Sequence, residues 1–133
     1  MILVDTSVWV GYLRGDATPA VERLEELIDR SAAIATTEPI VVELLAGATR
    51  PQELARVEAL ADGLPSIPVD AVTDYRDAGQ LYRSSALNGH PIRSMLDCVI
   101  AAVAIRRDLP LLHQDRDFAF LAEISPLRDE LTG

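Results

Sequence analysis

Several acidic residues of this chain lie within or directly beside apolar stretches, where an unpaired carboxylate is costly. Asp5 ends the apolar run ILVD, and Glu43 is the lone charge in IVVELLAGA. Asp97 lies near the start of SMLDCVIAAVAI, and Asp115 and Asp117 follow the apolar LPLL. Four separate apolar segments therefore each contain or directly precede an acidic residue. A chemical role for these acids would explain why they lie in apolar surroundings.

A shared metal ion is one such reason. Carboxylates that are brought together repel one another and raise one another's pKa, and a divalent cation removes that conflict. Hard oxygen ligands favour Mg²⁺ or Mn²⁺ over Zn²⁺, and the chain has only one cysteine and two histidines to offer. Such cations commonly act on phosphates by activating water and stabilising the leaving oxygen. The acids therefore predict a Mg²⁺ or Mn²⁺ site for phosphoester chemistry.

Structural alternatives for the first two acids stay open at this point. Asp5 would cap the helix that follows it, with Thr6 and Ser7 sharing the task. Glu43 would form an ion pair with an arginine such as Arg14 or Arg50. Either arrangement would satisfy the carboxylate without any metal.

The later acids have structural alternatives as well. Ser94 and Asp97 have the spacing of a capping box, in which the acid reaches back to the amide that begins the helix. Asp115 and Asp117 would be an N-cap and a first-turn acid, both favoured by the helix dipole. Acids are common at helix starts, so these alternatives are not independent of one another.

The elements that must position these acids alternate along the chain. Strands are expected at 2–5, 32–36, 65–70 and 109–114, the third at or near a sheet edge because prolines flank it. Helices are expected at 8–14 (capped by Ser7), 19–30, 37–47, 51–63, 71–89, 94–107 and 115–124. Short apolar strands that alternate with helices indicate an α/β domain with a parallel sheet. Ligands bind beyond the carboxyl ends of strands in such a sheet, and acids follow two of them.

Length and composition narrow the class of protein. A chain of 133 residues that is 49% hydrophobic predicts a single domain over 1–133 with one core. Neither a signal peptide nor a bilayer span is expected, and the single Cys98 suggests a reducing cytoplasm and a small buried side chain. The net charge of −9 argues against nonspecific binding to nucleic acid, although all 12 basic residues are arginine, which suits bidentate contact with phosphate.

Four stretches, in this order and spacing, carry a resemblance to a known family. ILVDTSVW, EPIVVELLAGA, LDCVIAAVA and LLHQDRDFAFLA resemble PIN-domain ribonucleases, and more narrowly the VapC toxins of bacterial VapBC toxin–antitoxin pairs. Each stretch alone is weak, but the ordered set is specific and anchors the whole chain. The resemblance implies a three-layer α/β/α sandwich with a central parallel sheet and an endoribonuclease that depends on Mg²⁺ or Mn²⁺. It also implies a homodimer and neutralisation by a cognate VapB antitoxin, whose tail occupies the active site.

The resemblance also assigns roles to the acids. Asp5, Glu43, Asp97 and Asp115 match the four acids of the family site, with Asp117 beside them as a further acid. We expect Asp5 and Asp97 to hold the principal metal, with Asp115 or Asp117 contributing directly or through water. Glu43 is expected to position the attacking water and to act as general base.

Other residues near the acids are candidates for supporting roles. Ser7 matches a hydroxyl that supports the family site, whereas His113 stands where the family often has Thr or Ser. Arg14, Arg93 and Arg116 lie near the acids in sequence and are candidate contacts for the RNA backbone. The alternative that they are ordinary surface arginines stays open.

Three rival functions share some of these features. A haloacid-dehalogenase-like phosphatase would need a second Asp two residues after the first, and Ser7 occupies that place. A PIN-domain nuclease that acts in RNA processing would share the chemistry, but such proteins often carry extra domains or insertions. A non-catalytic PIN-like interaction domain would not need to retain every acid.

Overall fold

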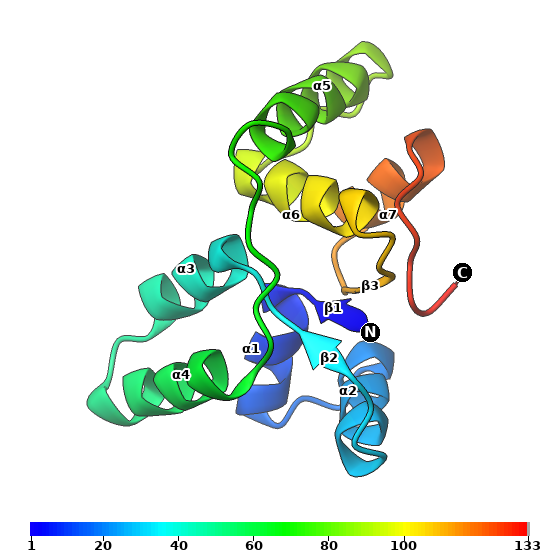
Figure 1. Cartoon of the computed structure of the whole chain (residues 1–133). Helices are drawn as coiled ribbons and strands as arrows, with labels where there is room; N and C mark the ends of the chain where they lie inside the picture. The colour runs from blue at the N-terminus through cyan, green and yellow to red at the C-terminus, as the bar shows by residue number, and fades with distance from the viewer. Residues whose placement is uncertain (133) are drawn as a thin grey trace.

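Three short parallel strands lie at the centre of the computed structural model, which describes residues 1–132 (Figure 1). β1 (Ile2–Val4) is the middle strand, with β2 (Ile34–Ala35) on one side and β3 (Leu111–Leu112) on the other. Strands of one direction end at one edge of the sheet, so the segments that follow β1 and β3 leave it side by side. Asp5 and Asp115 lie in those segments.

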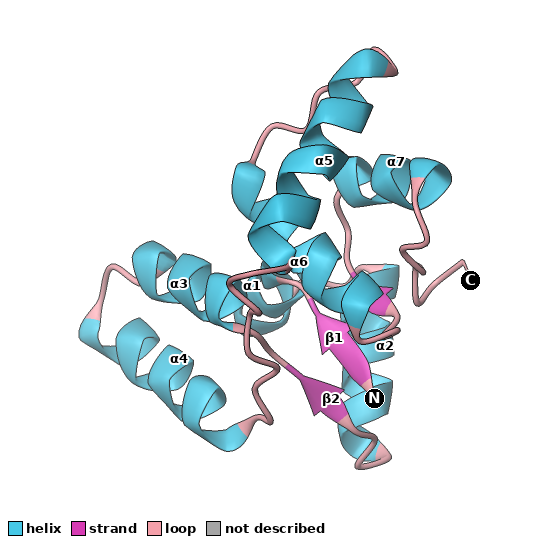
Figure 2. Cartoon of the chain, turned by 45° about the horizontal axis from the view of Figure 1, so that its top comes forward, coloured by secondary structure: helices cyan, strands magenta, loops and turns pink. Residues whose placement is uncertain are grey.

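Helices surround this sheet on both sides, as the three-layer prediction requires. They are α1 (Thr6–Arg14), α2 (Pro19–Asp29), α3 (Glu38–Gly47), α4 (Pro51–Gly63), α5 (Asp74–Leu87), α6 (Met95–Arg106) and α7 (Arg116–Ile124). α1 packs on α2, α3 packs on α4, and α6 packs on α5 and α7 (Figure 2). The predicted α/β sandwich with a central parallel sheet is confirmed.

The sheet edges differ from the sequence prediction. The strand expected at 65–70 is wrong: only one residue, Ser66, bridges to Thr36 beside β2. Pro65 and Pro68 have no amide hydrogen to donate, which limits how far the segment can pair. At the opposite edge Asp129 bridges to Leu111, so the charged C-terminal segment packs against β3.

Two helix starts also differ from the prediction, and in both cases an aspartate explains the difference. α1 begins at Thr6 with Asp5 as its N-cap, so the expected cap by Ser7 is wrong. α5 begins at Asp74 and not at residue 71, because the Asp70 side chain accepts bonds from the amides of Val72 and Thr73 and holds a turn there. α2, α4 and α6 lie within one residue of their predicted ranges.

The core is aliphatic and is centred on α6. Its residues from Cys98 to Ala104 are all buried, which explains why this helix is apolar on every side. Trp9 and Phe118 are the largest buried side chains, so Trp9 belongs to the core; Tyr12 packs edge-on against it, with ring centroids 5.8 Å apart. No helix in residues 1–132 has the length and apolar character of a membrane span.

Candidate active site

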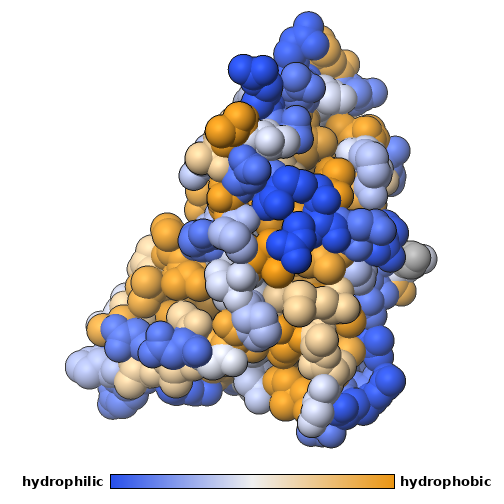
Figure 3. Space-filling view, in the orientation of Figure 1, coloured by the Kyte–Doolittle hydropathy of each residue, from blue (hydrophilic) through white to orange (hydrophobic). Residues whose placement is uncertain are grey.

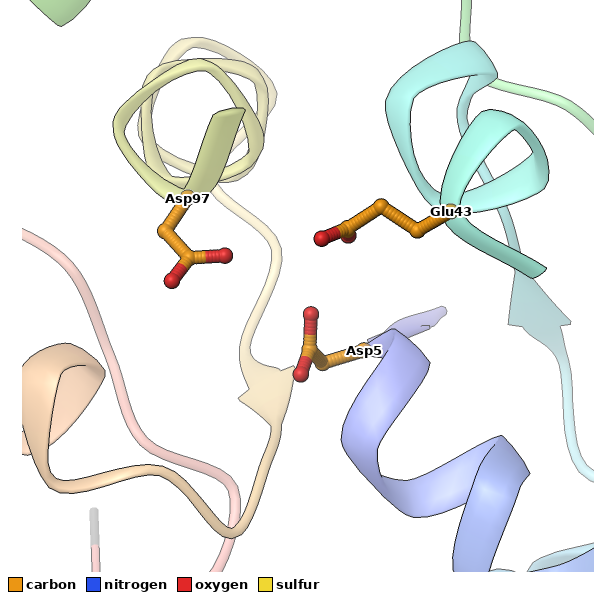
Figure 4. A group of neighbouring side chains, drawn as sticks. All are labelled: Asp5, Glu43 and Asp97. Atoms are coloured by element: carbon orange, nitrogen blue, oxygen red, sulfur yellow. The ribbon is translucent and has the colours of Figure 1, made fainter. Parts of the chain in front are cut away.

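Asp5, Glu43 and Asp97 meet at one point, although they come from the end of β1, from α3 and from α6. One carboxylate oxygen of each lies within 4.8 Å of the others. Figure 4 shows the three side chains directed toward one another from three separate elements. We call these residues the acid trio; no other group of this kind is found in the described part of the chain.

Asp5 serves two purposes through its two oxygens. Oδ2 accepts bonds from the Ser7 amide (3.0 Å) and the Ser7 hydroxyl (2.6 Å), so the side chain caps α1. Oδ1 is buried and has no hydrogen-bond partner in the described structure. Burial is the main cause that raises the pKa of Asp5, against the opposing hydrogen bonds from Ser7. Capping therefore leaves one oxygen of Asp5 available to a ligand.

Glu43 is held by a hydroxyl and not by a cation. Thr6 Oγ1 donates to Glu43 Oε1 at 2.7 Å, and the ion pair expected with Arg14 or Arg50 is not formed in residues 1–132. Burial raises the pKa of Glu43, and the negative charges of neighbouring acids, first that of Asp5, raise it further. The side chain is thus both fixed and electrostatically uncompensated.

Asp97 lies in the first turn of α6 but does not form the expected capping box. The Ser94 side chain makes no capping hydrogen bond, and the amide of Asp97 donates to the Ser94 carbonyl oxygen at 3.1 Å. Burial is the first cause that raises the pKa of Asp97 to about 7, and the charges of the other site acids, led by Asp5, add to it. The structural alternative for this acid is therefore not realised.

Asp115 and Asp117 have a different environment, which we call the arginine-bound pair. Asp115 caps α7, and its Oδ1 accepts from the Asp117 amide (2.9 Å) and from Arg93 Nη2 (3.0 Å). Asp117 is buried; its Oδ1 accepts from His90 Nε2 (3.0 Å) and its Oδ2 from Arg93 N and Nε (both 3.1 Å). Burial by itself raises the pKa of Asp117, but the bonds from His90 and Arg93 bring it to about 2.

A second layer of polar contacts connects the end of β3 to the start of α1. The amide of Gln114 donates to Ser7 Oγ at 3.3 Å, so the hydroxyl that supports Asp5 is itself held. His113 is buried; its Nδ1 accepts from the Asp115 amide (3.2 Å) and its Nε2 donates to Asp129 Oδ2 (2.9 Å). The histidine that departs from the family pattern therefore fixes the backbone of Asp115.

The three candidate RNA-contacting arginines have unequal positions. Arg93 is joined to the arginine-bound pair, whereas the exposed side chains of Arg14 and Arg116 have no hydrogen bond or ion pair among residues 1–132. Arg14 also borders a groove of about 470 Å³ between α1 and the α3–α4 pair. This groove is lined by apolar side chains (Val10, Leu13, Leu44 and Val57), by three arginines (Arg14, Arg50 and Arg56), and by Glu43 and Glu53, the second of which pairs with Arg50.

Sequence reasoning missed the bond from Thr6 to Glu43 and the bond between His90 and Asp117. Thr6 directly follows Asp5, so its position next to a candidate ligand was a usable signal. His90 stacks on Phe120 with ring centroids 4.3 Å apart and bonds to Asp117. No local pattern predicts that contact, because 27 residues separate the two partners.

The donor set fits a divalent cation. All three acids of the trio offer hard oxygen atoms, and the buried Asp5 Oδ1 lacks any hydrogen-bond partner in the described structure. A buried oxygen without a partner is costly, and a bound cation would satisfy it. The same cation would offset the repulsion that raises the pKa of Asp97.

Comparison with known proteins identifies the family. A PIN-domain model matches residues 2–124. The sequence is 42% identical over 129 residues to ribonuclease VapC11 of Mycobacterium tuberculosis, with 96% of each chain covered. It is 38% identical over 132 residues to ribonuclease VapC19 of the same species, covering 95% of this chain and 98% of the other.

Solved structures agree with the sequence relatives. VapBC2 from Rickettsia felis, bound to a promoter DNA fragment, superposes with a TM-score of 0.76 at 21% identity over 98% of both chains, which supports the fold. VapBC-5 from Mycobacterium tuberculosis superposes with a TM-score of 0.67 at 27% identity, over 96% of this chain and 95% of the other. The chain therefore belongs to the PIN-domain family, among the VapC ribonucleases.

Proposed function

We propose that this chain is the toxin of a toxin–antitoxin pair, acting as a divalent-metal-dependent endoribonuclease that hydrolyses RNA phosphodiester bonds. The observation that carries the proposal is the acid trio, in which a buried oxygen of Asp5 has no hydrogen-bond partner within the described residues. Its relatives at 42% and 38% identity are named ribonucleases. Retention of every expected acid disfavours a non-catalytic interaction domain.

Mg²⁺ or Mn²⁺ is the proposed ion, held by Asp5 and Asp97 with Asp115 contributing. Bound there, it would supply activation of water and stabilisation of the leaving oxygen. Asp115 is included because its Oδ1 is taken by Arg93 and the Asp117 amide, while its Oδ2 has no hydrogen bond among residues 1–132. Asp117 is the weakest candidate ligand, since both of its oxygens already accept bonds.

Glu43 is the proposed general base. The bond from Thr6 fixes one of its oxygens, and its raised pKa makes it a better proton acceptor than an ordinary glutamate. Asp5 and Asp97 lie opposite it in the trio and would remain unprotonated to hold the ion. The proton released by the water would therefore pass to Glu43 and not to Asp5 or Asp97.

Cleavage of RNA by the purified protein tests this proposal. We expect cleavage with Mg²⁺ or Mn²⁺ and none in excess EDTA, and we expect Asp97→Asn to lose activity while it keeps the fold. The matched control is Asp62→Asn, an exposed aspartate of α4 outside the site, which should remain fully active. Unchanged cleavage in EDTA, or full activity of the Asp97 variant, would contradict the proposal.

A VapB-type antitoxin is the proposed partner, and we assign its binding segment to the groove beside Glu43. The groove combines apolar walls with Arg14, Arg50 and Arg56, and it adjoins the acid trio, so one bound segment would also cover the active site. Co-expression with a candidate antitoxin tests this assignment. Leu13→Asp should abolish co-purification and inhibition while cleavage persists; an intact inhibited complex would refute it.

We also propose a homodimer, an RNA substrate and a cytoplasmic location, with the whole chain acting as one domain. Large exposed apolar side chains support the dimer: Val42 on α3, Tyr75 and Leu87 on α5, and Met95 on α6. Figure 3 shows apolar surface over α3, at the left of the view. Sedimentation equilibrium at micromolar concentration tests the dimer, and a monomer there would rule it out.

A further inference from the structure

Arg93 links the loop before α6 to the start of α7 through two acids. Its backbone N and its Nε both donate to Asp117 Oδ2 at 3.1 Å, and its Nη2 donates to Asp115 Oδ1 at 3.0 Å. His90, from the same loop, donates to the other oxygen of Asp117. The loop that leads into α6 is therefore fastened to α7 by a buried carboxylate.

The exposure of this ion pair is very unequal. The Asp117 side chain is 2% exposed, whereas the Arg93 side chain is 64% exposed. Nη1 of Arg93 has no hydrogen bond among residues 1–132, although Nε and Nη2 are both taken. The buried Asp117 thus fixes the orientation of the exposed Arg93 guanidinium group, and Nη1 of that group remains available to a ligand.

Asp115 connects this guanidinium group to the acid trio. Arg93 contacts Asp115, and the charge of Asp115 acts on both Glu43 and Asp97. Only one carboxylate therefore separates Arg93 from the trio. A strand whose scissile phosphate occupies the trio would pass its neighbouring phosphates within reach of such a group.

We propose that Arg93 binds a phosphate of the RNA strand and that Asp117 is its positioning residue and not a metal ligand. The inference rests on the proposed ribonuclease function and adds a substrate contact to it. Arginine is suited to phosphate because its planar donors match the oxygens, and a group already held in one orientation loses less entropy on binding. Both oxygens of Asp117 are committed to this task.

Metal titration separates the positioning role from a ligand role without any RNA. Mn²⁺ affinity is measured by calorimetry for the wild type and for Asp97→Asn, Asp117→Asn and Arg93→Ala. We expect the Asp97 variant to lose detectable binding. The Asp117 and Arg93 variants should resemble each other and lose no more than about 100-fold in Mn²⁺ affinity, as for residues outside the ligand set. Loss of Mn²⁺ binding in Asp117→Asn alone would overturn the proposal.

RNA affinity tests the phosphate contact. A fluorescein-labelled 20-nucleotide RNA pool of mixed sequence is titrated with protein in the Glu43→Gln background, at saturating Mn²⁺ and several salt concentrations. Arg93→Ala should weaken binding and reduce the salt slope by about 0.7, the value for one phosphate contact on a single strand. The matched control, Arg107→Ala, removes an exposed arginine at the C-terminal end of α6, the opposite end of that helix from Asp97, and should leave the slope nearly unchanged. Equal slopes for all three proteins would refute the contact.

A double variant tests whether Asp117 acts through Arg93. If Asp117 acts through Arg93, adding Asp117→Asn to Arg93→Ala should change RNA affinity no further. Additive losses would mean that Asp117 does not act through Arg93.

A second variant covers the case in which Asp117→Asn fails to fold. His90→Ala removes one bond to Asp117 and should weaken RNA binding, but by less than Arg93→Ala does. Wild-type RNA affinity in His90→Ala would count against the positioning role of Asp117. Cleavage of RNA by the wild type in excess EDTA would contradict the proposed ribonuclease function. The Mn²⁺ titration does not depend on cleavage, so the proposed function and the proposed role of Asp117 can fail separately.

Discussion

Asp97 and Asp117 occupy similar positions in the chain but have opposite environments. Each lies in the first turn of a helix, α6 and α7 respectively. The pKa of Asp97 is raised to about 7, by burial and by neighbouring acids. The pKa of Asp117 is about 2, because hydrogen bonds from His90 and Arg93 outweigh the effect of its burial. Burial raises both values, so the presence or absence of a cationic partner decides the outcome.

The same division holds for the whole group of five acids. The acid trio has no arginine or histidine bonded to it within residues 1–132, and it retains an oxygen without a partner. The arginine-bound pair is compensated by the protein itself. A compensated carboxylate stabilises structure, whereas an uncompensated buried group attracts a cation from solution. Five predictions test this division, beginning with the largest expected effect.

Asp5→Asn should reduce RNA cleavage by roughly 10³-fold, as expected for a group that acts as part of one catalytic unit. The same change should not destabilise the metal-free protein, since it removes a buried charge that other acids repel. Cleavage assays and urea unfolding in EDTA check both parts. Metal-free protein that is markedly less stable after the change would mean that the trio stabilises the fold.

Asp117→Asn should have the opposite effect on stability. It removes the buried negative charge that accepts hydrogen bonds from His90 and Arg93. The free energy of unfolding in EDTA should therefore fall by about 2 kcal/mol. Urea unfolding measures the change, with Asp62→Asn as the exposed control. An unaltered unfolding midpoint would show that the arginine-bound pair does not hold the two helices together.

The stability of the metal-free protein should depend on pH through Asp97. Its pKa rises from an ordinary value of 3.8 to about 7 in the fold, so the folded state binds more protons between those values. The free energy of unfolding should therefore fall as the pH rises from about 4 to about 7, by about 1 kcal/mol after allowance for solvent screening. Asp97→Asn should flatten this dependence.

Added metal provides the complement to the pH experiment. At pH 7.5 Mn²⁺ at 100 times its Kd should raise the free energy of unfolding by about 2.7 kcal/mol, because it binds only the folded protein. The stabilisation should be small at pH 5, where Asp97 is protonated. Equal stabilisation at both pH values would argue that the ion does not bind at the trio.

Ser7→Ala should have a smaller effect than Asp5→Asn or Asp117→Asn. It removes one of the two bonds that orient Asp5, while the Ser7 amide continues to donate to the same oxygen. We expect a loss of about 1 kcal/mol in stability and of about 10-fold in Mn²⁺ affinity. Unfolding and calorimetry measure the two effects, and Ser7→Thr, which keeps a hydroxyl, should retain most of the affinity.

The sequence by itself determined the α/β class and the segments that carry acids. Apolar runs with few charges predicted β1, β2, β3 and the buried α6, because periodicity and burial are local properties of a segment. The position of acids after strands placed Asp5 and Asp115 at one sheet edge. The order of motifs then indicated the family, which the PIN-domain match over residues 2–124 bears out.

Only the tertiary structure decided how the acids divide. Ser94 and Asp97 have the spacing of a capping box that does not form, and the segment at 65–70 has the composition of a strand but bridges at one residue. The partners that distinguish Asp117 from Asp97 lie 24 and 27 residues away, on a loop with no pattern of its own. A carboxylate's charge state depends on which groups the fold brings within hydrogen-bonding distance, and spacing along a chain does not encode those contacts.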